Sequence, residues 1–340
     1  MKINRFINSK LAFGLIALAA ATGFSSCNKE NDAKPTVAQV AVSMPGFTQL
    51  EAAAIRGGVA IALSNKNPND PSGNYTVFAP TNDAFARLGL VNPQDLNVLQ
   101  KPFLTNVLLY HVSSGSLNQT QVMSAGNIPS LLTEPVNRAA VPKKVIVRNN
   151  EYYINGSKIL ATDVQADNGI VHVIDKVLLA TGADIVGSAV TLKNAQGFIT
   201  PELSFLVEAV LYADLAGALT KGPGTPSFTV FAPTDQAFKD LGVILGVPLN
   251  VPADIRKLPK DVVANVLLNH VIADGGKFTS ELFQGTLNPL LTTSSLTLGA
   301  YNNGVLPVSG RGNAQPANMV IPDIQTTNGV VHIIDRVLLP

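Results

Sequence analysis

The hexapeptide Thr-Val-Phe-Ala-Pro-Thr occurs twice in the chain, at residues 76–81 and again at residues 229–234. The similarity extends over 14 positions, of which ten are identical between 76–89 and 229–242. In each copy a short β-rich apolar run ends at a proline, which donates no hydrogen bond to a sheet. The threonine that follows is well placed to cap a helix. The stretch therefore predicts a buried strand that leads directly into a helix, in two copies.

Two further blocks recur in the same order. Asn-Val-Leu-Leu-x-His-Val stands at 106–112 and 265–271, with six of seven residues identical. Its apolar residues and its histidine share one face at steps of three and four, which predicts a helix. The third block, Asn-Gly-x-Val-His-x-Ile-Asp-x-Val-Leu-Leu, stands at 168–179 and 328–339 with nine of 12 residues identical.

The third block begins with Asn-Gly, a strong hairpin dipeptide, and continues as an apolar run. We expect one continuous strand from Ile170 to Leu179 and another from Val330 to Leu339, with partner strands at 159–164 and 319–324. Helices therefore come early in each copy and strands come late. This order predicts an α+β fold and not an alternating βαβ one.

Three blocks repeated over a domain-sized period indicate a tandem duplication. We place the first domain at residues 38–180 and the second at 184–340, with a joint of only a few residues. Because this joint contains no flexible Gly/Ser tether, we expect a semi-rigid pair of domains.

These three blocks together resemble the fasciclin (FAS1) domain, and the resemblance covers residues 38–340 in both copies. It implies two tandem domains, each a β-sandwich or wedge of about seven strands with helices packed on one side. Members of the family are secreted or membrane-anchored and mostly mediate cell adhesion or matrix binding. Bacterial members are typically surface lipoproteins or secreted proteins.

The N-terminus is typical of an export signal, with three basic residues, no acidic residue and then an apolar run of 11 residues. The only cysteine of the chain, Cys27, follows Phe24-Ser25-Ser26 and resembles a lipoprotein cleavage site, although the family usually has Leu where Phe24 stands. We predict a signal peptide at 1–26, lipidation of Cys27 and a polar tether at 27–37. Lipidation implies attachment to the outer membrane, with the cell surface as the expected face. The alternative is an ordinary cleaved signal with an incidental cysteine.

Composition and motifs argue against several functions. The 340 residues are 46% hydrophobic and 14% charged, with a net charge of +1, so no basic surplus is present to neutralise a nucleic-acid backbone. The sequence contains no Gly-x-Ser-x-Gly, no His-Glu-x-x-His and no phosphate-binding glycine loop before a helix. We therefore predict no enzymatic activity, no cofactor and no nucleic-acid partner, and an enzyme is the least favoured alternative.

The four histidines fall two per copy, each inside a repeated block. Because they lie on apolar faces, we predict core residues whose ring nitrogens bond to the backbone. The alternative is a metal or acid–base site in each copy, built from His111, His172 and Asp163 or from His270, His332 and Asp323.

Two sets of residues are candidates for binding. Tyr110 and His111 match a Tyr-His pair implicated in integrin binding by animal fasciclin proteins, whereas the second copy has Asn269 before its histidine. The alternative interpretation of Tyr110 is an aromatic side chain that packs at the surface at the end of its helix.

A glycan-binding protein of a polysaccharide-uptake system is a second functional hypothesis. Its best sugar-stacking residues would be Tyr152, Tyr153 and Tyr301, although the absence of Trp weakens it. We favour a non-enzymatic surface protein that binds an extracellular protein or a polysaccharide and that touches the membrane only through its lipid.

Overall fold

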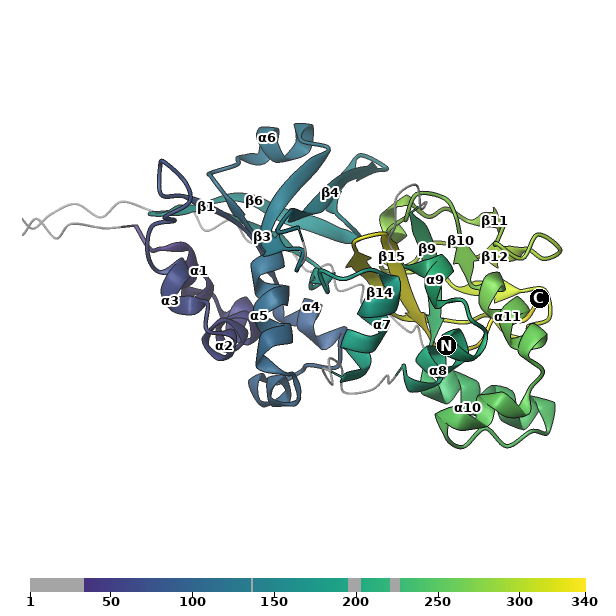
Figure 1. Ribbon diagram of the computed structural model, residues 1–340. Coiled ribbons are helices and arrows are strands. Elements are labelled where there is room, and N and C mark those ends of the chain that lie inside the picture. Colours follow the sequence, from purple (N-terminus) through teal and green to yellow (C-terminus); the bar gives the residue numbers. More distant parts are fainter. Residues whose placement is uncertain (1–33, 136, 195–202, 221–226) are drawn as a thin grey trace, which may run out of the picture. The chain divides into compact units, whose positions relative to one another are not determined.

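The computed structural model describes residues 34–135, 137–194, 203–220 and 227–340 (Figure 1). The predicted signal peptide 1–26, the predicted lipidation site Cys27 and the tether as far as residue 33 lie outside the described residues. From Lys34 onward the chain forms a single compact unit. Among the described residues, no helix combines the length and the apolar character needed to cross a bilayer.

The first repeat contains seven strands in a single sheet, in the order β2-β1-β7-β6-β5-β4-β3. Its strands are β1 (Tyr75–Pro80), β2 (Val112–Ser114), β3 (Asn127–Thr133), β4 (Ala140–Arg148), β5 (Glu151–Ile154), β6 (Ser157–Ala166) and β7 (Gly169–Ile174). Its helices are α1 (Val37–Ser43), α2 (Thr48–Gly57), α3 (Ala60–Leu63), α4 (Asn82–Ala86), α5 (Lys101–Tyr110) and α6 (Gln119–Ser124), with 3-10 turns η1 (Pro45–Phe47) and η2 (Pro93–Val98). Figure 1 shows α1 to α5 on one side of the strands and α6 on the other. The predicted α+β fold with about seven strands is confirmed.

The second repeat divides its strands between two sheets. A five-stranded sheet has the order β10-β9-β15-β14-β8, and a three-stranded sheet has the order β11-β12-β13. The end of the first repeat supplies one strand of the five-stranded sheet, β8 (Leu179–Ala180). The second repeat supplies β9 (Phe228–Pro233), β10 (Val271–Ile272), β11 (Gly285–Leu287), β12 (Leu296–Leu298), β13 (Val308–Gly310), β14 (Met319–Thr326) and β15 (Gly329–Ile334). The helices are α7 (Ile185–Asn194), α8 (Ser204–Tyr212), α9 (Ala216–Leu219), α10 (Asp235–Leu245) and α11 (Lys260–Asn269), with 3-10 turns η3 (Pro252–Lys257) and η4 (Thr279–Glu281).

The repeated hexapeptide forms the predicted strand and helix start in both copies. Strands β1 and β9 are buried at every position, and each pairs in parallel with the last long strand of its repeat, β7 or β15. The Thr81 side chain accepts a hydrogen bond from the backbone N–H of Ala84, and Thr234 does the same with Ala237. Each cap satisfies one of the unpaired N–H groups at a helix N-terminus and so fixes where the helix begins.

The glycine of each Asn-Gly turn is required by close contact with a neighbouring strand. A Cβ atom on Gly169 would lie 2.0 Å from the carbonyl oxygen of Tyr75, and one on Gly329 would lie 2.1 Å from that of Phe228. Any other residue would push the first and last strands of the repeat apart. The turn therefore sets the register of the parallel pair as well as reversing the chain.

The prediction of continuous strands to Leu179 and Leu339 is wrong. Strand β7 ends at Ile174 and β15 ends at Ile334. Beyond β7 the backbone N–H of Leu178 donates to the Nε2 atom of His111, so it is not available to a neighbouring strand. The first repeat then ends in β8, which pairs with β14 of the second repeat.

Candidate functional site

His111 and His270 each connect the C-terminal part of a helix to the last segment of the same repeat by hydrogen bonds. The Nδ1 atom of His111 donates to the carbonyl oxygen of Val107 at 2.7 Å, and Nε2 accepts from the N–H of Leu178 at 2.9 Å. His270 makes the same two bonds, to Val266 at 2.7 Å and from Leu338 at 2.8 Å. This arrangement needs a neutral ring with its proton on Nδ1.

His172 and His332 hold the opposite tautomer. The Nε2 atom of His172 donates to the carbonyl of Leu117 at 2.8 Å, and Nδ1 faces the N–H of Asp163 at 3.4 Å. In the second repeat, Nε2 of His332 donates to Lys277 at 2.9 Å and Nδ1 accepts from the N–H of Asp323 at 3.2 Å. Each aspartate stands at an irregularity in β6 or β14 with a positive φ, which turns its N–H toward the ring.

Burial keeps these four histidines neutral. It lowers the pKa of His111 and of His270 to about 4, against the hydrogen bonds to Val107 and Val266, which raise it. The pKa values of His172 and His332 are also lowered, again chiefly by burial. The predicted structural role of the histidines therefore agrees with their hydrogen bonds.

The geometry does not support the alternative of a metal or acid–base site. Each histidine uses both ring nitrogens for backbone bonds, so none has a lone pair directed at a ligand. Within the described part of the chain, no three His, Cys, Asp or Glu side chains come together as a possible metal site.

Tyr110 and His111 lie inside the first repeat and not on its surface, with exposed fractions of 0% and 2%. The Tyr110 hydroxyl donates to the carbonyl of Pro142 at 2.9 Å and accepts from the Asn155 side chain at 2.8 Å. Both interpretations of Tyr110, as part of an exposed binding surface and as an aromatic side chain packed at the surface, place it at the surface, and the structure buries it. Contact of the pair with a partner would require the repeat to open locally, and a binding role for them stays a prediction.

Lys143 is a buried polar residue beside Tyr110 that the sequence analysis missed. Its Nζ atom donates to the carbonyls of Tyr110 and Val112 at 3.2 and 3.3 Å and to Oγ of Ser113 at 2.6 Å. It also lies 5.2 Å from the centre of the Phe78 ring. Burial holds the pKa of Lys143 well below its usual value. Successive side chains of β4 alternate between the two faces of the sheet, and this alternation places Lys143 on the inner face. The alternation can be read from the sequence and could have identified Lys143.

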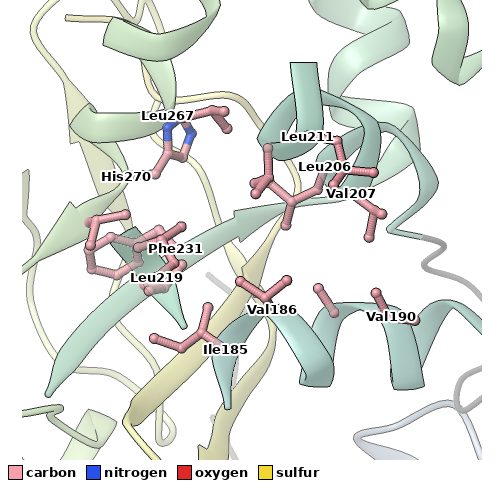
Figure 2. A pocket seen from close by; sticks show the side chains of 14 residues that line it. Ile185, Val186, Val190, Leu206, Val207, Leu211, Leu219, Phe231, Leu267 and His270 are labelled. Atoms are coloured by element: carbon pink, nitrogen blue, oxygen red, sulfur yellow. The ribbon is translucent and has the colours of Figure 1, made fainter. Parts of the chain in front are cut away.

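An apolar cavity of about 90 Å³ lies among the helices of the second repeat. Figure 2 shows side chains of α7 and α8 facing one another across it, with Phe231, Leu267 and His270 closing one end. Among the described residues, every lining side chain except that of His270 is apolar. The corresponding helices of the first repeat enclose a cavity of about 140 Å³ that His111 lines in the same way.

A second kind of hollow, an open groove of about 280 Å³, lies beside β5 and β6. Tyr152, Gln119 and Asn150 line it, together with the ion pair of Lys158 and Glu151. The other two sugar-stacking candidates lie elsewhere. Tyr153 is buried and donates to Glu151, and Tyr301 is half-buried with its ring against the Arg148 guanidinium.

Polar contacts join the two repeats. Lys176 of the first repeat forms a buried ion pair with Asp323 of the second, with Nζ and Oδ2 2.8 Å apart. Lys176 also donates to Oγ1 of Thr279 at 3.0 Å and to the carbonyl of Gly304 at 2.6 Å. Burial alone would raise the pKa of Asp323, but the Lys176 ammonium, His332 and the hydrogen bonds from Lys176 and Thr279 together outweigh burial and hold that pKa below its usual value.

Arg148 forms a second set of contacts across the same interface. One guanidinium nitrogen donates to the carbonyls of Thr279, Ser280 and Leu282 in and after η4. Lys144 pairs with Glu281 of the same turn. Carbonyl acceptors suit a guanidinium because it has five N–H donors in a fixed geometry.

Gly156 permits a close approach between the repeats. A Cβ atom there would lie 1.9 Å from a carboxylate oxygen of Asp323. The sequence shows only an Asn-Gly turn at this point, so the requirement appears once the second repeat is in place.

The model of the family described as Fasciclin domain matches the chain at residues 45–180 and again at 201–340. The chain belongs to the fasciclin family. The predicted domain starts at residues 38 and 184 lie before these ranges and stay predictions.

Relatives of the two fasciclin repeats come from bacteria and animals. Protein sll1483 of Synechocystis is 35% identical over 149 residues, which are 44% of this chain and 75% of that protein. Human periostin is 29% identical over 279 residues, which are 79% of this chain and 28% of periostin. The pig transforming growth factor-beta-induced protein ig-h3 is 26% identical over 272 residues, which are 79% of this chain and 35% of that protein. The chain thus spans about a third or less of the two animal proteins.

A solved FAS1 domain pair from the insect cell adhesion molecule Fasciclin I is 18% identical, with a TM-score of 0.38, over 89% of this chain and 96% of that one. Fasciclin domains are found in cell-adhesion and extracellular proteins, and the fasciclin relatives of this chain are mostly secreted or extracellular.

Proposed function

We propose that this protein is an exported, non-enzymatic adhesion protein held at the outer membrane by lipid on Cys27. The observation that carries the proposal is the pair of fasciclin matches, which together extend from residue 45 to residue 340. Because fasciclin domains are found in cell-adhesion proteins, these two domains support a role in which the protein acts by contact with a partner. An extracellular protein or a polysaccharide is the proposed partner.

The use of the histidines supports a non-enzymatic role. General acid–base catalysis needs a side chain that can exchange a proton with substrate. Both nitrogens of all four histidines are bonded to backbone groups, and burial lowers the pKa values of all four. The hydrogen bonds hold the four rings in one orientation, and burial favours their neutral form.

The lipid anchor is tested by changing Cys27 to Ala in cells that make the protein. We expect the wild-type protein in the membrane fraction and the variant in the soluble fraction, because lipidation requires the thiol. Ser26→Ala serves as the matched control and should leave the protein in the membrane fraction. An unchanged membrane fraction for Cys27→Ala would disprove the anchor without bearing on the adhesion role.

The adhesion role is tested by immobilising the purified protein and measuring attachment of other cells and of extracellular polymers to it. Saturable attachment that soluble protein competes away supports the proposal. A surface that captures neither cells nor polymers contradicts it.

Glycan binding is a second candidate function, favoured by the open groove along β5 and β6. Tyr152 offers an aromatic face there, and Gln119, Asn150 and the pair of Glu151 and Lys158 offer hydrogen-bonding groups. Sugar sites commonly combine such a ring with such groups. On a glycan array, Tyr152→Ala should lose the signal and Tyr152→Phe should keep most of it. Equal signals from both variants would place any glycan site elsewhere.

A further inference from the structure

The apolar cavities of the two repeats are built from equivalent residues. The backbone N–H of Val37 bonds to the side chain of Asn168 at 2.8 Å, and that of Ile185 bonds to Asn328 at 2.9 Å. The first bond holds the start of α1 against the first repeat, and the second bond holds the start of α7 against the second repeat. They also set the residue-by-residue correspondence of the two helices.

The next helices correspond in the same way. The N–H of Gln49 bonds to the Asn82 side chain at 3.1 Å, and that of Phe205 bonds to Asp235 at 2.8 Å. With both registers fixed, the cavity walls can be compared position by position. The matched lining pairs are Val37 and Ile185, Ala41 and Ala189, Leu50 and Leu206, Val77 and Val230, Leu108 and Leu267, and His111 and His270.

Aliphatic side chains that line both cavities face solvent, and in the first repeat the exposed Gln39 and Ser64 lie beside them in the lining. Val42 is 57% exposed and its equivalent Val190 is 37% exposed. Ile55 is 65% exposed and its equivalent Leu211 is 53% exposed. All four also line the cavities. A core needs no aliphatic side chain at such positions, so their presence in both repeats points to an apolar ligand that enters there.

The interior of the second cavity excludes polar ligands, whereas Gln39, Glu51 and Ser64 add polar groups to the lining of the first. In the second repeat, the ring nitrogens of His270, the single polar side chain among the described lining residues, are both bonded to the backbone. A sugar or a peptide backbone would lose its bonds to water there and gain none, at a cost that grows with each buried polar group. An alkyl chain carries no such groups. An apolar cavity of about 150 Å³ stays dry and binds small hydrocarbons; the first cavity, at about 140 Å³, is close to that volume, and the second, at about 90 Å³, is smaller.

We propose that each repeat binds one unbranched alkyl chain, of the kind found in fatty acids and lipids, between its first two helices. The chain would enter past Val42 and Ile55 in the first repeat and past Val190 and Leu211 in the second. Its polar head would remain in solvent. This proposal does not depend on the adhesion role or on the lipid anchor.

The test is titration calorimetry of the full chain carrying Cys27→Ala with ethyl, butyl and hexyl β-D-glucosides. We expect two sites per chain. Affinity should rise about fourfold with each added methylene until the cavity is full, as burial of a methylene predicts. Methyl β-D-glucoside is the headgroup control and should not compete. Affinity that does not depend on chain length, or competition by methyl glucoside, would overturn the proposal.

Matched variants locate the sites. Ala41→Phe and Ala189→Phe place a ring in the first and second cavity respectively, and each should remove one of the two sites. Ala41→Leu and Ala189→Leu are smaller changes for use if the phenylalanine variants fail to fold. Val243→Phe adds a ring at an exposed position of α10 and should leave both sites. Two sites retained in folded variants filled at both cavities would overturn the assignment.

The source of the alkyl chain is distinguished by photo-crosslinking in cells fed a diazirine-labelled fatty acid. Crosslinks to α1 or α2 that disappear in the Cys27→Ala protein identify the protein's own acyl chains. Crosslinks that persist identify separate lipids or fatty acids. The lack of any crosslink to the helices of either cavity would contradict the proposal.

Discussion

The first and last parts of each repeat are nearly the same, whereas the middle parts differ. Strands β1 and β9, helices α5 and α11, and strands β7 and β15 are equivalent, and the histidines bond alike in both. Between them, the first repeat has the long strands β3 and β4 in its single sheet, while the second has only the short strands β11 to β13 in a separate sheet.

The interface explains why the middle parts differ. Arg148 and Gly156 of the first middle segment contact Thr279 and Asp323 of the second repeat. In a head-to-tail pair the two copies use different surfaces, so the same segment serves different contacts in each. The strands, helices and histidines that the two repeats share form a common frame that maintains the fold. The divergent middle segments join the two copies.

The cores beneath these segments differ as well. In the first repeat Lys143 is buried against Ser113 and Phe78. At the position equivalent to Ser113 the second repeat has Ile272, which packs in an aliphatic cluster with Leu296 and Leu298. One copy therefore fills this space with a hydrogen-bonded amine and the other with apolar side chains.

Acidification should produce the largest effect, because it acts on the frame common to both repeats. The pKa of His111 and of His270 is about 4 in the folded chain and 6.5 in an unfolded one. Their contribution is complete above pH 6.5 and is lost as pH falls from 6.5 toward 4, on the order of 3 kcal/mol per histidine. Urea unfolding at several pH values measures this loss. A free energy of unfolding that stays constant over this range would contradict the neutral-histidine frame.

Lys143→Ala should cost about 4 kcal/mol, the largest effect of any single substitution proposed here. It removes the donor to three buried acceptors and leaves a cavity. The double variant Ser113→Val with Lys143→Met imitates the apolar solution of the second repeat and should lose less. If the double variant is the less stable of the two, the comparison of the cores is wrong.

His111→Ala and His270→Ala should each cost about 3 kcal/mol. Each leaves a buried N–H, of Leu178 or of Leu338, without its acceptor and opens a cavity. Chemical denaturation of the two variants side by side gives the comparison. Because the bonds are the same, a large inequality between the two losses would show that the frames are not equivalent.

Asp323→Asn should lower the free energy of unfolding by about 3 kcal/mol, because the amide keeps the shape while Lys176 loses its buried counter-charge. Its characteristic result is weaker coupling of the repeats, seen as a broader or divided thermal transition. Asp335→Asn, where the carboxylate bonds within the second repeat to Asn318, is the control and should keep one sharp transition.

Local patterns in the sequence were enough to predict the frame. The proline and threonine after β1, the Asn-Gly turns and the apolar faces around the histidines each act within a few residues. The early end of β7 could not be predicted, because it depends on a bond from Leu178 to His111, 67 residues away. The burial of Tyr110 also depends on distant residues, Pro142 and Asn155. The interface depends on contacts between copies that no single motif contains.

Calorimetric unfolding of the two-repeat chain tests most directly the claim that the fasciclin repeats form one unit. The contacts of Lys176, Arg148 and Lys144, together with the pairing of β8 and β14, predict a single transition whose calorimetric and van't Hoff enthalpies agree. Two separate transitions, with a calorimetric enthalpy about twice the van't Hoff value, would show that the repeats unfold independently and would contradict the account.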